Sequence, residues 1–480
     1  MLLGVLSAAA LPPVHAIPVL LLTVPGLLTL IGAQRDWKGA GWIGFWFGFG
    51  LHLIGLYWIT EAILIEAARF WWLVPFAVPG LAAVLALFIA VPCALARLAQ
   101  AGWPRVLIFT GTWLLADLLR QFIATGFPWN PLGSVWEVPG GFGDVFIQPA
   151  AWIGVHGLTL LTLLLAASPS LGRRAMAGGL AVLALWAGVG VWRLSRPASP
   201  PPGLTAVLVQ ENVAEGTIRD AASAEAAFTR LLSLTQQGVA QANGARTVVV
   251  WSETASPYLL ATDSNARAAI ADVSAGPAFV GSVRFDEQGR PRNSLMGLVN
   301  AGPPVVVYDK WHLVPFGEYK PSWLPISIPT LPGGGMAPGT GPKTLHVPGV
   351  PPAGALICYE AIFPAQVVDR ADRPEWLVNV TNDAWFGNST GPRQHLAAAR
   401  MRAVEEGLPL IRAANTGISA GFDAFGRELG RLEMNRIGVL DIAIPGYLPA
   451  TPFARFGLFI PLVLALLTIV AGVIPAVKQR

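Results

Sequence analysis

Three residues that together could carry out acyl transfer follow separate apolar runs of the sequence. Glu253 ends the run TVVVWSE, Lys310 ends PVVVYDK, and Cys358 lies in GALICYE. A carboxylate can take the proton of a thiol, because the thiolate is the reactive form, and a nearby cation stabilises both the thiolate and the oxyanion of an attacked carbonyl group. Each residue alone also fits a simpler role, as a cap, a surface charge or a core residue. Together, however, the three residues stand in the same position, at the ends of three separate strands. This arrangement favours a catalytic role over the three simpler roles.

The region around these residues alternates short apolar runs with helical segments. We predict strands over residues 204–213, 247–253, 279–285, 294–301, 304–310, 354–360 and 375–383, two further strands within 410–427, and helices over 219–242 and 393–407. This alternation predicts a layered α/β fold, in which the carboxyl ends of strands carry the chemistry. The sequence shows no internal repeat, phosphate-binding loop, dinucleotide-binding glycine motif or cluster of metal-ligand residues, so we expect neither a cofactor nor a metal.

The composition separates this region from a part adapted to lipid. Of the 480 residues, 54% are hydrophobic and only 12% are charged, about half of the charged share that is usual in soluble domains. This excludes a disordered chain and argues against nucleic-acid binding. Most charged residues lie between residues 203 and 450, after a linker at 197–203. We therefore expect a transmembrane domain over residues 1–196, a globular catalytic domain over 203–447, and a last transmembrane helix with its cytoplasmic tail over 453–480.

Eight apolar stretches are candidates to cross a membrane. They cover residues 2–13, 16–33, 39–59, 72–96, 105–123, 150–168, 174–192 and 454–475. The first two also fit a signal peptide followed by one helix, an alternative that the lack of basic residues before the first run disfavours. Basic residues concentrate in alternate loops, which predicts that the N-terminus is cytoplasmic and that the globular domain lies on the other side.

Two charged residues lie near the end of the fifth stretch. Asp117 and Arg120 are three positions apart, so on a helix their side chains can form an ion pair. Charges at such a position are candidates for function, and anchoring or helix packing explains them equally well. The two cysteines, Cys93 and Cys358, lie in the apolar part and the globular part respectively, so we expect no disulfide.

The motifs around the three candidate residues resemble those of the carbon–nitrogen hydrolase (nitrilase) superfamily. The strings WSE (251–253), YDKWHLVPFGEY (308–319) and ICYE (357–360) are similar to its Glu, Lys and Cys motifs and occur in the same order. The segments 379–395 and 402–419 are similar to its C-terminal half, and the resemblance implies an αββα sandwich. With the eight stretches and GFPW (126–129), the whole chain resembles the apolipoprotein N-acyltransferase family, although Asp117 stands where a Glu is expected.

This resemblance implies a multi-pass protein of the bacterial inner membrane whose catalytic domain faces the periplasm. The family moves an acyl chain from the sn-1 position of a phospholipid, usually phosphatidylethanolamine, to the α-amine of the N-terminal diacylglyceryl-cysteine of an apolipoprotein. The matching residues imply that Glu253 is the general base, Cys358 forms a thioester and Lys310 stabilises the oxyanion. Glu318 would orient Lys310 and Glu253. We expect a monomer that binds no nucleic acid.

Further residues match positions close to these motifs. Tyr359 and Glu360 follow the nucleophile, where a backbone N–H can join the oxyanion hole and Glu360 can help to hold the incoming amine. Trp385 and Phe386 are candidate contacts for the acyl chain, although packing in the core is the commoner role of such residues. The Gly- and Pro-rich segment 325–343 is a candidate lid that keeps water from the thioester, or a simple connector.

Two other functions remain compatible with the sequence. A membrane-tethered amidase that hydrolyses a small amide would use the same three residues, but it does not explain eight apolar stretches. A transporter whose outer domain only binds a ligand is disfavoured, because the stretches contain almost no paired charges and no repeat.

Overall fold

The computed structural model describes residues 1–65, 67–320 and 335–477. The described chain divides into two compact units. Unit 1 contains residues 1–196, 389–401 and 450–480, and unit 2 contains residues 197–388 and 402–449. The short segment 389–401 thus groups with unit 1, although it lies within the region that the sequence analysis treats as one globular domain.

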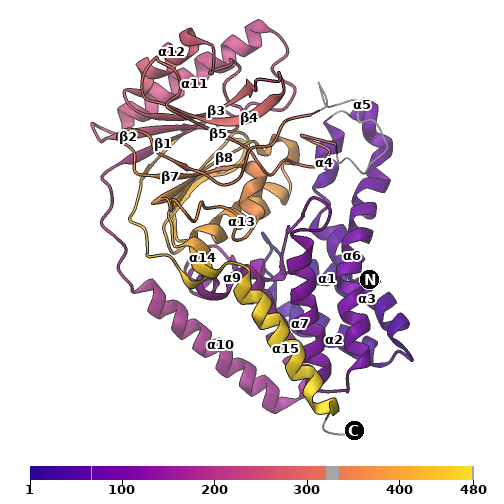
Figure 1. Ribbon diagram of the computed structural model, residues 1–480. Coiled ribbons are helices and arrows are strands. Elements are labelled where there is room, and N and C mark those ends of the chain that lie inside the picture. The colour runs from indigo at the N-terminus through magenta and orange to yellow at the C-terminus, as the bar shows by residue number, and fades with distance from the viewer. Residues whose placement is uncertain (66, 321–334, 478–480) are drawn as a thin grey trace. The chain divides into compact units, whose positions relative to one another are not determined.

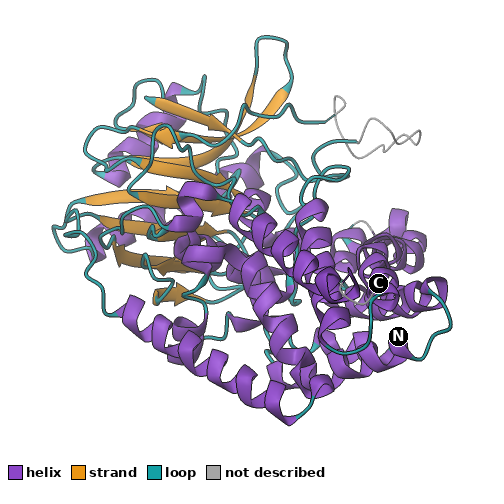
Figure 2. Ribbon diagram, turned by 60° about the horizontal axis from the view of Figure 1, so that its bottom comes forward, coloured by secondary structure: helices purple, strands orange, loops and turns teal. Residues whose placement is uncertain are grey.

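Unit 1 consists of helices and the loops that join them, and every strand that the structure describes lies in unit 2 (Figure 2). Its helices are α1 (Leu2–Ala8), α2 (Leu20–Gly32), α3 (Trp37–Gly55), α4 (Ile59–Leu64), α5 (Ala67–Phe70), α6 (Val74–Leu98), α7 (Trp103–Arg120), α8 (Gly141–Phe146), α9 (Ala150–Ala167), α10 (Arg173–Leu194), α14 (Pro452–Phe456) and α15 (Phe459–Val477). Helix α13 (Gly391–Glu406) begins in unit 1 and ends in unit 2.

Within the described part of unit 1, three helical stretches are long and apolar enough to cross a membrane: Ala67–Leu98, Ala150–Leu171 and Arg173–Leu194. Two shorter apolar helices cover Ile17–Gly32 and Phe459–Ile474. Helices α3 and α7 occupy two more of the predicted crossings. The crossing expected at residues 2–13 is different, because α1 has only 7 residues, and a helix needs about 20 residues to span the hydrocarbon core.

Glycines on α3 allow α3 and α6 to pack closely. A Cβ atom at Gly44 would lie 2.6 Å from Sγ of Cys93, and one at Gly48 would lie 2.9 Å from Cα of Ala86. Small residues at such contacts let two membrane helices approach until their backbones nearly touch. Cys93 is therefore a buried packing residue of α6, and neither cysteine forms a disulfide.

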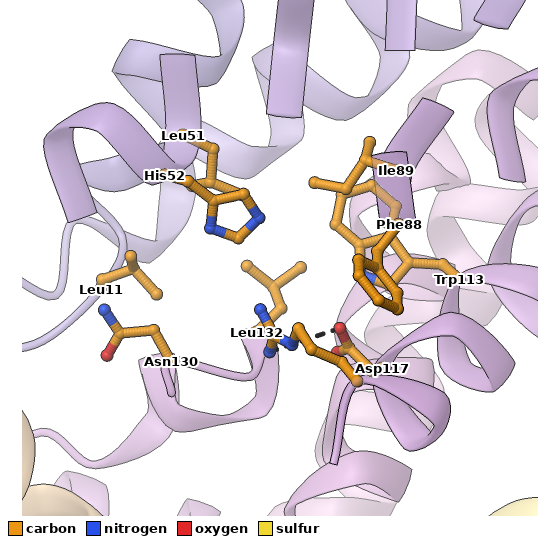
Figure 3. Close-up of a pocket in the computed structure, with 10 residues that line it drawn as sticks. Leu11, Leu51, His52, Phe88, Ile89, Trp113, Asp117, Asn130 and Leu132 are labelled. Carbon is orange, nitrogen blue, oxygen red and sulfur yellow. Dashed lines mark ion pairs between the residues drawn. The ribbon is translucent and has the colours of Figure 1, made fainter. Parts of the chain in front are cut away.

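The predicted pair of Asp117 and Arg120 is confirmed. Nη2 of Arg120 lies 3.5 Å from Oδ1 of Asp117, and both side chains are buried at the C-terminal end of α7. The pair borders a small cavity within unit 1 (Figure 3). The cavity is lined by Leu11, Leu51, His52, Phe88, Ile89, Trp113, Asp117, Arg120, Asn130 and Leu132.

A buried glutamine joins three segments of unit 1. The indole N–H groups of Trp58 and Trp129 donate hydrogen bonds to Oε1 of Gln394, at 3.1 and 2.8 Å, and Nε2 of Gln394 donates to the carbonyl oxygen of Pro12 at 3.2 Å. Trp129 ends the GFPW string that the sequence analysis singled out. This tryptophan is therefore fixed by packing and hydrogen bonding within the protein.

Unit 2 is built on two six-stranded sheets (Figure 1). The first contains, in spatial order, β12 (Gly438–Ala443), β1 (Thr205–Gln210), β2 (Thr247–Trp251), β3 (Ala278–Phe285), β4 (Pro291–Leu298) and β5 (Val306–Asp309). The second contains β11 (Glu428–Leu432), β10 (Ser419–Phe422), β9 (Leu410–Ala414), β8 (Trp376–Thr381), β7 (Ala353–Ile357) and β6 (Thr344–Leu345). Strands β1–β3 are parallel, as are β7–β9.

Apolar side chains fill the space on both faces of the first sheet. Helices α11 (Ala221–Gln241) and α12 (Ser264–Ser274) pack on one face, where Phe228 and Leu231 meet Val249 and Trp251. The two sheets meet at the other face, and the rings of Phe279 and Trp376 lie 6.0 Å apart between centroids. Strands buried on both faces read as continuous apolar runs, which is why the runs in β1 and β2 were recognisable from the sequence.

The strand predictions agree with the structure in the central parts of both sheets and at the edge strand β5, and they miss the other three edge strands. Strands β6, β11 and β12 were not predicted, because they are short or only half-buried and lack a continuous apolar run. The predicted strand 354–360 ends earlier, at Ile357, and Cys358 begins the one-turn helix η6 (Cys358–Ile362).

Replacement of Gly154 by alanine is expected to destabilise unit 1. Gly154 lies in a kink of α9 with φ of 66°, and a Cβ atom there would lie 2.8 Å from ring carbons of Phe453. Strain and overpacking together should lower the free energy of unfolding by about 2 kcal/mol or more. Thermal unfolding in detergent measures this, with Gly188→Ala in α10 as the control, because nothing lies within 4 Å of a Cβ atom there. Equal unfolding temperatures for the two variants would contradict the prediction.

Candidate active site

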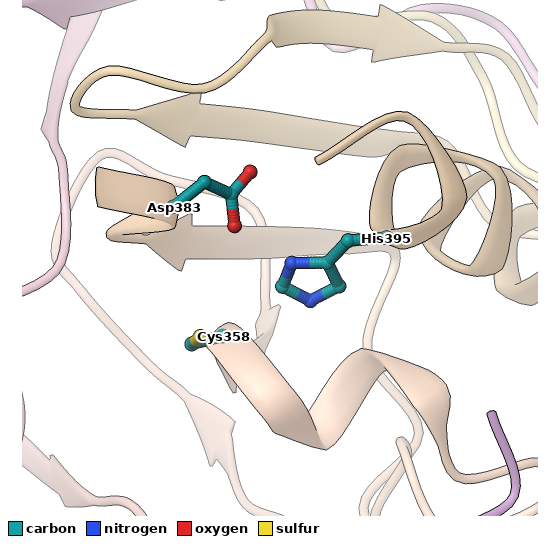
Figure 4. A group of neighbouring side chains, drawn as sticks. All are labelled: Cys358, Asp383 and His395. Carbon is teal, nitrogen blue, oxygen red and sulfur yellow. The ribbon is translucent and has the colours of Figure 1, made fainter. Parts of the chain in front are cut away.

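The strand ends of unit 2 position the three residues predicted from the sequence. Lys310 directly follows β5, Cys358 directly follows β7, and Glu253 comes two residues after β2 ends. Strand β5 runs in the same direction as β2, because β3 is parallel to β2 and the next two pairings are antiparallel. Glu253 and Lys310 therefore emerge from the same edge of the first sheet. Cys358 emerges from the second sheet, at the start of a short helical turn (Figure 4).

Strands β1, β2 and β7 are each followed, within three residues, by a residue with a left-handed backbone conformation. The φ angles are 53° at Asn212 after β1, 49° at Thr254 after β2 and 50° at Cys358 after β7. Residues other than glycine adopt this conformation at a cost of about 1–3 kcal/mol, and such strain concentrates at functional sites. At Cys358 the turn lifts the thiol out of the line of the strand.

Lys310 is a buried cation held between two carboxylates. Its side chain is 1% exposed, and its Nζ lies 3.0 Å from Oε1 of Glu253 and 2.9 Å from Oε1 of Glu318. Burial alone would lower the pKa of Lys310, but the charges of Glu253 and Glu318 raise it well above its usual value. Lys310 therefore stays protonated, as an oxyanion stabiliser must.

Asn293 on β4 is a site residue that the sequence analysis missed. Its Nδ2 donates hydrogen bonds to Oε1 of Glu253 at 2.7 Å and to Oε1 of Glu318 at 3.1 Å. The remaining oxygens accept backbone N–H groups, Oε2 of Glu253 from Asn382 at 2.8 Å and Oε2 of Glu318 from Val314 at 2.7 Å. Every carboxylate oxygen around Lys310 thus has a partner. The available signal was an asparagine at the border of a predicted buried strand.

Cys358 is a buried thiol in a mixed electrostatic environment. Its residue is 6% exposed. Burial raises the pKa of the Cys358 thiol, the Glu253 charge raises it further, and the Lys310 charge lowers it. The resting state is therefore a thiol, and a base must remove the proton as the sulfur attacks.

Asp383, two residues after β8 ends, lies close to Cys358. A carboxylate oxygen of Asp383 is within 4.8 Å of Sγ of Cys358. The same carboxylate pairs with Arg412 on β9, whose Nη2 lies 2.8 Å from Oδ2, and both side chains are 0% exposed. Nη1 of Arg412 also donates to Asn379 at 2.6 Å. A buried ion pair thus supports the turn beside the thiol.

The two residues after the nucleophile have structural contacts. Oε1 of Glu360 accepts the backbone N–H of Trp311 and Oε2 accepts that of Ile357, both at 2.7 Å. Burial raises the pKa of Glu360 to about 7, although these hydrogen bonds lower it. Glu360 is 0% exposed, and its role in holding the incoming amine stays a prediction. It ties the Cys358 turn to the residue after Lys310, while Tyr359 packs its ring against Phe363 at 5.2 Å.

Trp385 and Phe386 lie in the short helix η7 (Asp383–Phe386) after β8. Trp385 is 43% exposed, so packing in the core is not its role, and Phe386 is half-buried. The candidate lid at 325–343 lies mostly outside the described residues. An exposed tryptophan close to the nucleophile's sheet is an apolar surface that a lipid chain can contact.

The assembled groups provide the parts of a thiol-based acyl transfer. Glu253 is an ionisable carboxylate, Lys310 is a permanent cation, and Cys358 is a protonated thiol with strained backbone. Such a site can form a thioester and stabilise the charge of the tetrahedral intermediates on either side of it. Glu318 and Asn293 hold Lys310 and Glu253 in place.

Two known protein families match this chain, one in unit 1 and one mainly in unit 2. Residues 3–168 match the family described as the apolipoprotein N-acyltransferase N-terminal domain, and residues 212–452 match the family described as carbon-nitrogen hydrolase. The second match agrees with the two-sheet topology of unit 2, which has a nitrilase-like α/β fold.

Relatives of the same name match along nearly the whole chain. An apolipoprotein N-acyltransferase from Bradyrhizobium diazoefficiens is 39% identical over 510 residues, covering 99% of this chain and 94% of the relative. Another from Brucella melitensis is 40% identical over 482 residues, covering 95% and 89%. Among solved structures, an amidase of the nitrilase superfamily from Nesterenkonia AN1 is 16% identical and covers 51% of this chain and 92% of its own, with a TM-score of 0.38.

Replacement of Gly281 by alanine is expected to displace Glu253. A Cβ atom on this β3 residue would lie 2.6 Å from N of Thr254 and 2.8 Å from Cα of Glu253. Because a displacement of about 1 Å can cost about 100-fold in rate, acyl transfer should fall by one to two orders of magnitude. Kinetic assays check this against Gly430→Ala on β11, where the nearest atom would be 3.4 Å away. A Gly281→Ala variant as active as that control would refute the prediction.

The rate at which Cys358 is alkylated should depend on pH, because burial raises the pKa of its thiol. With a small neutral reagent, the rate should keep rising from about pH 7 to about pH 9.5, because the raised pKa lies above the usual thiol value near 8.5. Lys310→Met should slow the reaction further, since the Lys310 charge lowers that pKa. Mass spectrometry of the Cys358 peptide measures the rate, with the exposed Lys343→Met as control. A plateau below about pH 8 would show a preformed thiolate instead.

Proposed function

Because the chain belongs to the apolipoprotein N-acyltransferase family and is therefore an acyltransferase, we propose that it N-acylates apolipoproteins at the expense of a membrane phospholipid. The donor is the sn-1 chain of a phospholipid such as phosphatidylethanolamine, and the acceptor is the α-amine of an N-terminal diacylglyceryl-cysteine. One observation carries the mechanism: the buried Lys310 lies between Glu253 and Glu318 and lowers the pKa of the Cys358 thiol.

In the first half of the reaction, Sγ of Cys358 attacks the ester carbonyl carbon of the donor. Glu253 takes the thiol proton as the S–C bond forms, and the negative charge moves to the carbonyl oxygen. The Lys310 ammonium and the backbone N–H of Tyr359 stabilise that oxyanion. The C–O bond then breaks, and Glu253 returns the proton to the oxygen of the departing lysophospholipid.

In the second half, the neutral acceptor amine attacks the thioester carbon. Glu253 takes a proton from the amine nitrogen as the C–N bond forms, and the C–S bond breaks when the second intermediate collapses. The proton passes to the sulfur, whose raised pKa favours the thiol and so restores the resting state. A covalent intermediate lets two bulky lipids use one site in turn.

The apolar helices of unit 1 support a site that is served from a membrane. We infer that the apolar helices of unit 1 lie in a bacterial inner membrane with unit 2 on its periplasmic side, because basic residues concentrate in the loops assigned to the cytoplasm. Donor and acceptor then share the outer leaflet. The 43% exposure of Trp385 supports a contact between this side chain and an acyl chain.

The acyl-enzyme provides the direct test. Purified protein incubated with a phospholipid labelled in its sn-1 chain should carry that chain on Cys358, and addition of a diacylglyceryl peptide should remove it. Mass spectrometry measures the adduct. Cys358→Ala should carry none, and Glu253→Gln should form it at least about 100-fold more slowly.

Cys93→Ala serves as the matched control, because Cys93 packs in α6. Its adduct should equal that of the wild type. Absence of any adduct on the wild type would exclude the transferase, and loss of the acyl chain to water rather than to the peptide would favour the amidase.

A further inference from the structure

The acceptor substrate carries an amine that is an ammonium in water, and the carboxylates of the catalytic centre are already engaged. Both oxygens of Glu253 and of Glu318 accept hydrogen bonds from Lys310, Asn293 or backbone N–H groups. Glu360 is fully buried, with both oxygens bound to backbone N–H groups. Recognition of the incoming cation therefore calls for a further acidic group that solvent can reach.

Glu215 meets this requirement. It lies in the loop after β1, is exposed, and accepts a hydrogen bond from the side chain of Asn382. It is close enough to Glu253 for the two charges to interact. Among the described residues it has no ion pair with a lysine or arginine, so its charge is available to a ligand.

Hydrogen bonds within unit 2 fix this loop relative to Glu253. Oδ1 of Asn415 accepts the backbone N–H of Val213 at 2.7 Å, and Nδ2 of Asn415 donates to the carbonyl oxygen of Val213 at 2.6 Å. The same Nδ2 donates to Oδ1 of Asn382 at 3.0 Å, and the backbone N–H of Asn382 donates to Glu253. Asn382 thus bridges the exposed carboxylate of Glu215 and the buried carboxylate of Glu253.

We propose that Glu215 binds the ammonium group of the acceptor substrate and holds it next to Glu253, an inference that rests on the function proposed above. A carboxylate paired with an ammonium gives a charge-assisted hydrogen bond with direction as well as attraction. Glu215 is then a specificity-determining residue that favours primary amines, and Asn382 is the positioning residue that orients it.

The geometry favours the acceptor over the donor as the source of this ammonium. The acceptor nitrogen is the attacking atom, so it must come within about 3.5 Å of the thioester carbon on Cys358. The bound ammonium first loses one proton to water, and Glu253 takes the second proton as the C–N bond forms. In phosphatidylethanolamine, the glycerol and phosphate groups separate the ammonium from the sn-1 carbonyl carbon. A carboxylate linked to Glu253 through one asparagine therefore lies on the path of the acceptor.

Separate measurement of the two half-reactions tests the proposal. Glu215→Gln should form the acyl-enzyme at the wild-type rate from both phosphatidylethanolamine and phosphatidylglycerol, which lacks the ammonium. Its KM for a diacylglyceryl peptide should rise about three- to tenfold, as for a partly exposed ion pair, with a smaller change in kcat. Glu215→Asp should recover part of the loss. The difference between wild type and Glu215→Gln should shrink at high salt, because ions screen exposed charges.

Glu225→Gln on α11 is the matched control, because it removes the same charge from an exposed position on that helix. Its acceptor KM should equal that of the wild type. An unchanged acceptor KM in Glu215→Gln would overturn the proposal, and so would a slower acylation by phosphatidylethanolamine alone, which would assign Glu215 to the donor headgroup. Failure of the wild type to form an acyl-enzyme would instead refute the proposed function itself.

Discussion

The candidate active site depends on one buried cation. An ammonium removed from water costs several kcal/mol unless opposite charges and hydrogen bonds surround it. Lys310 at 1% exposure meets this condition through Glu253 and Glu318. Asn293 joins both carboxylates from a neighbouring strand, so β2, β4, β5 and the loop after β5 must all be in register for the charge to be stable. Because the buried charge of Lys310 must be compensated, the positions of Glu253 and Glu318 around it are fixed. These are the groups on which the proposed chemistry depends.

The site also contains residues with strained backbone conformations, which the two surrounding sheets must keep in place. The left-handed turns at Thr254 and Cys358 directly follow apolar strands, and they remain because those strands are anchored in the core. Gly281 lets the backbone of β3 approach Glu253 more closely than any side chain would allow. The buried pair of Asp383 and Arg412 supports the turn next to the thiol from the second sheet. Rigid strands thus give precise positions to groups that would not adopt them in a flexible loop.

The features that could be predicted from the sequence are those carried by residues close to one another along the chain. Glu253, Lys310 and Cys358 stand directly behind apolar runs, and the motifs around them predicted the family, which the relatives confirm. Asn293 could not be predicted, because it reaches Glu253 only when strands 40 residues apart align. The Asp383–Arg412 pair joins residues 29 positions apart, and the motif around Glu360 does not encode the backbone N–H groups that bond to its carboxylate. The edge strands β6, β11 and β12 lack a continuous apolar run, and α1 has only 7 residues.

The pairing of β1 with β12 has a consequence for the biosynthesis of the protein. Thr205 at the start of unit 2 pairs with Ala443 near its end, and β12 is the outer neighbour of β1 in the first sheet. While the ribosome makes the chain, β1 therefore has an open edge until almost the whole of unit 2 has emerged. Long-range pairings form slowly, and unpaired strand edges invite aggregation. A nascent chain of this architecture thus exposes an unpaired strand edge during most of the synthesis of unit 2.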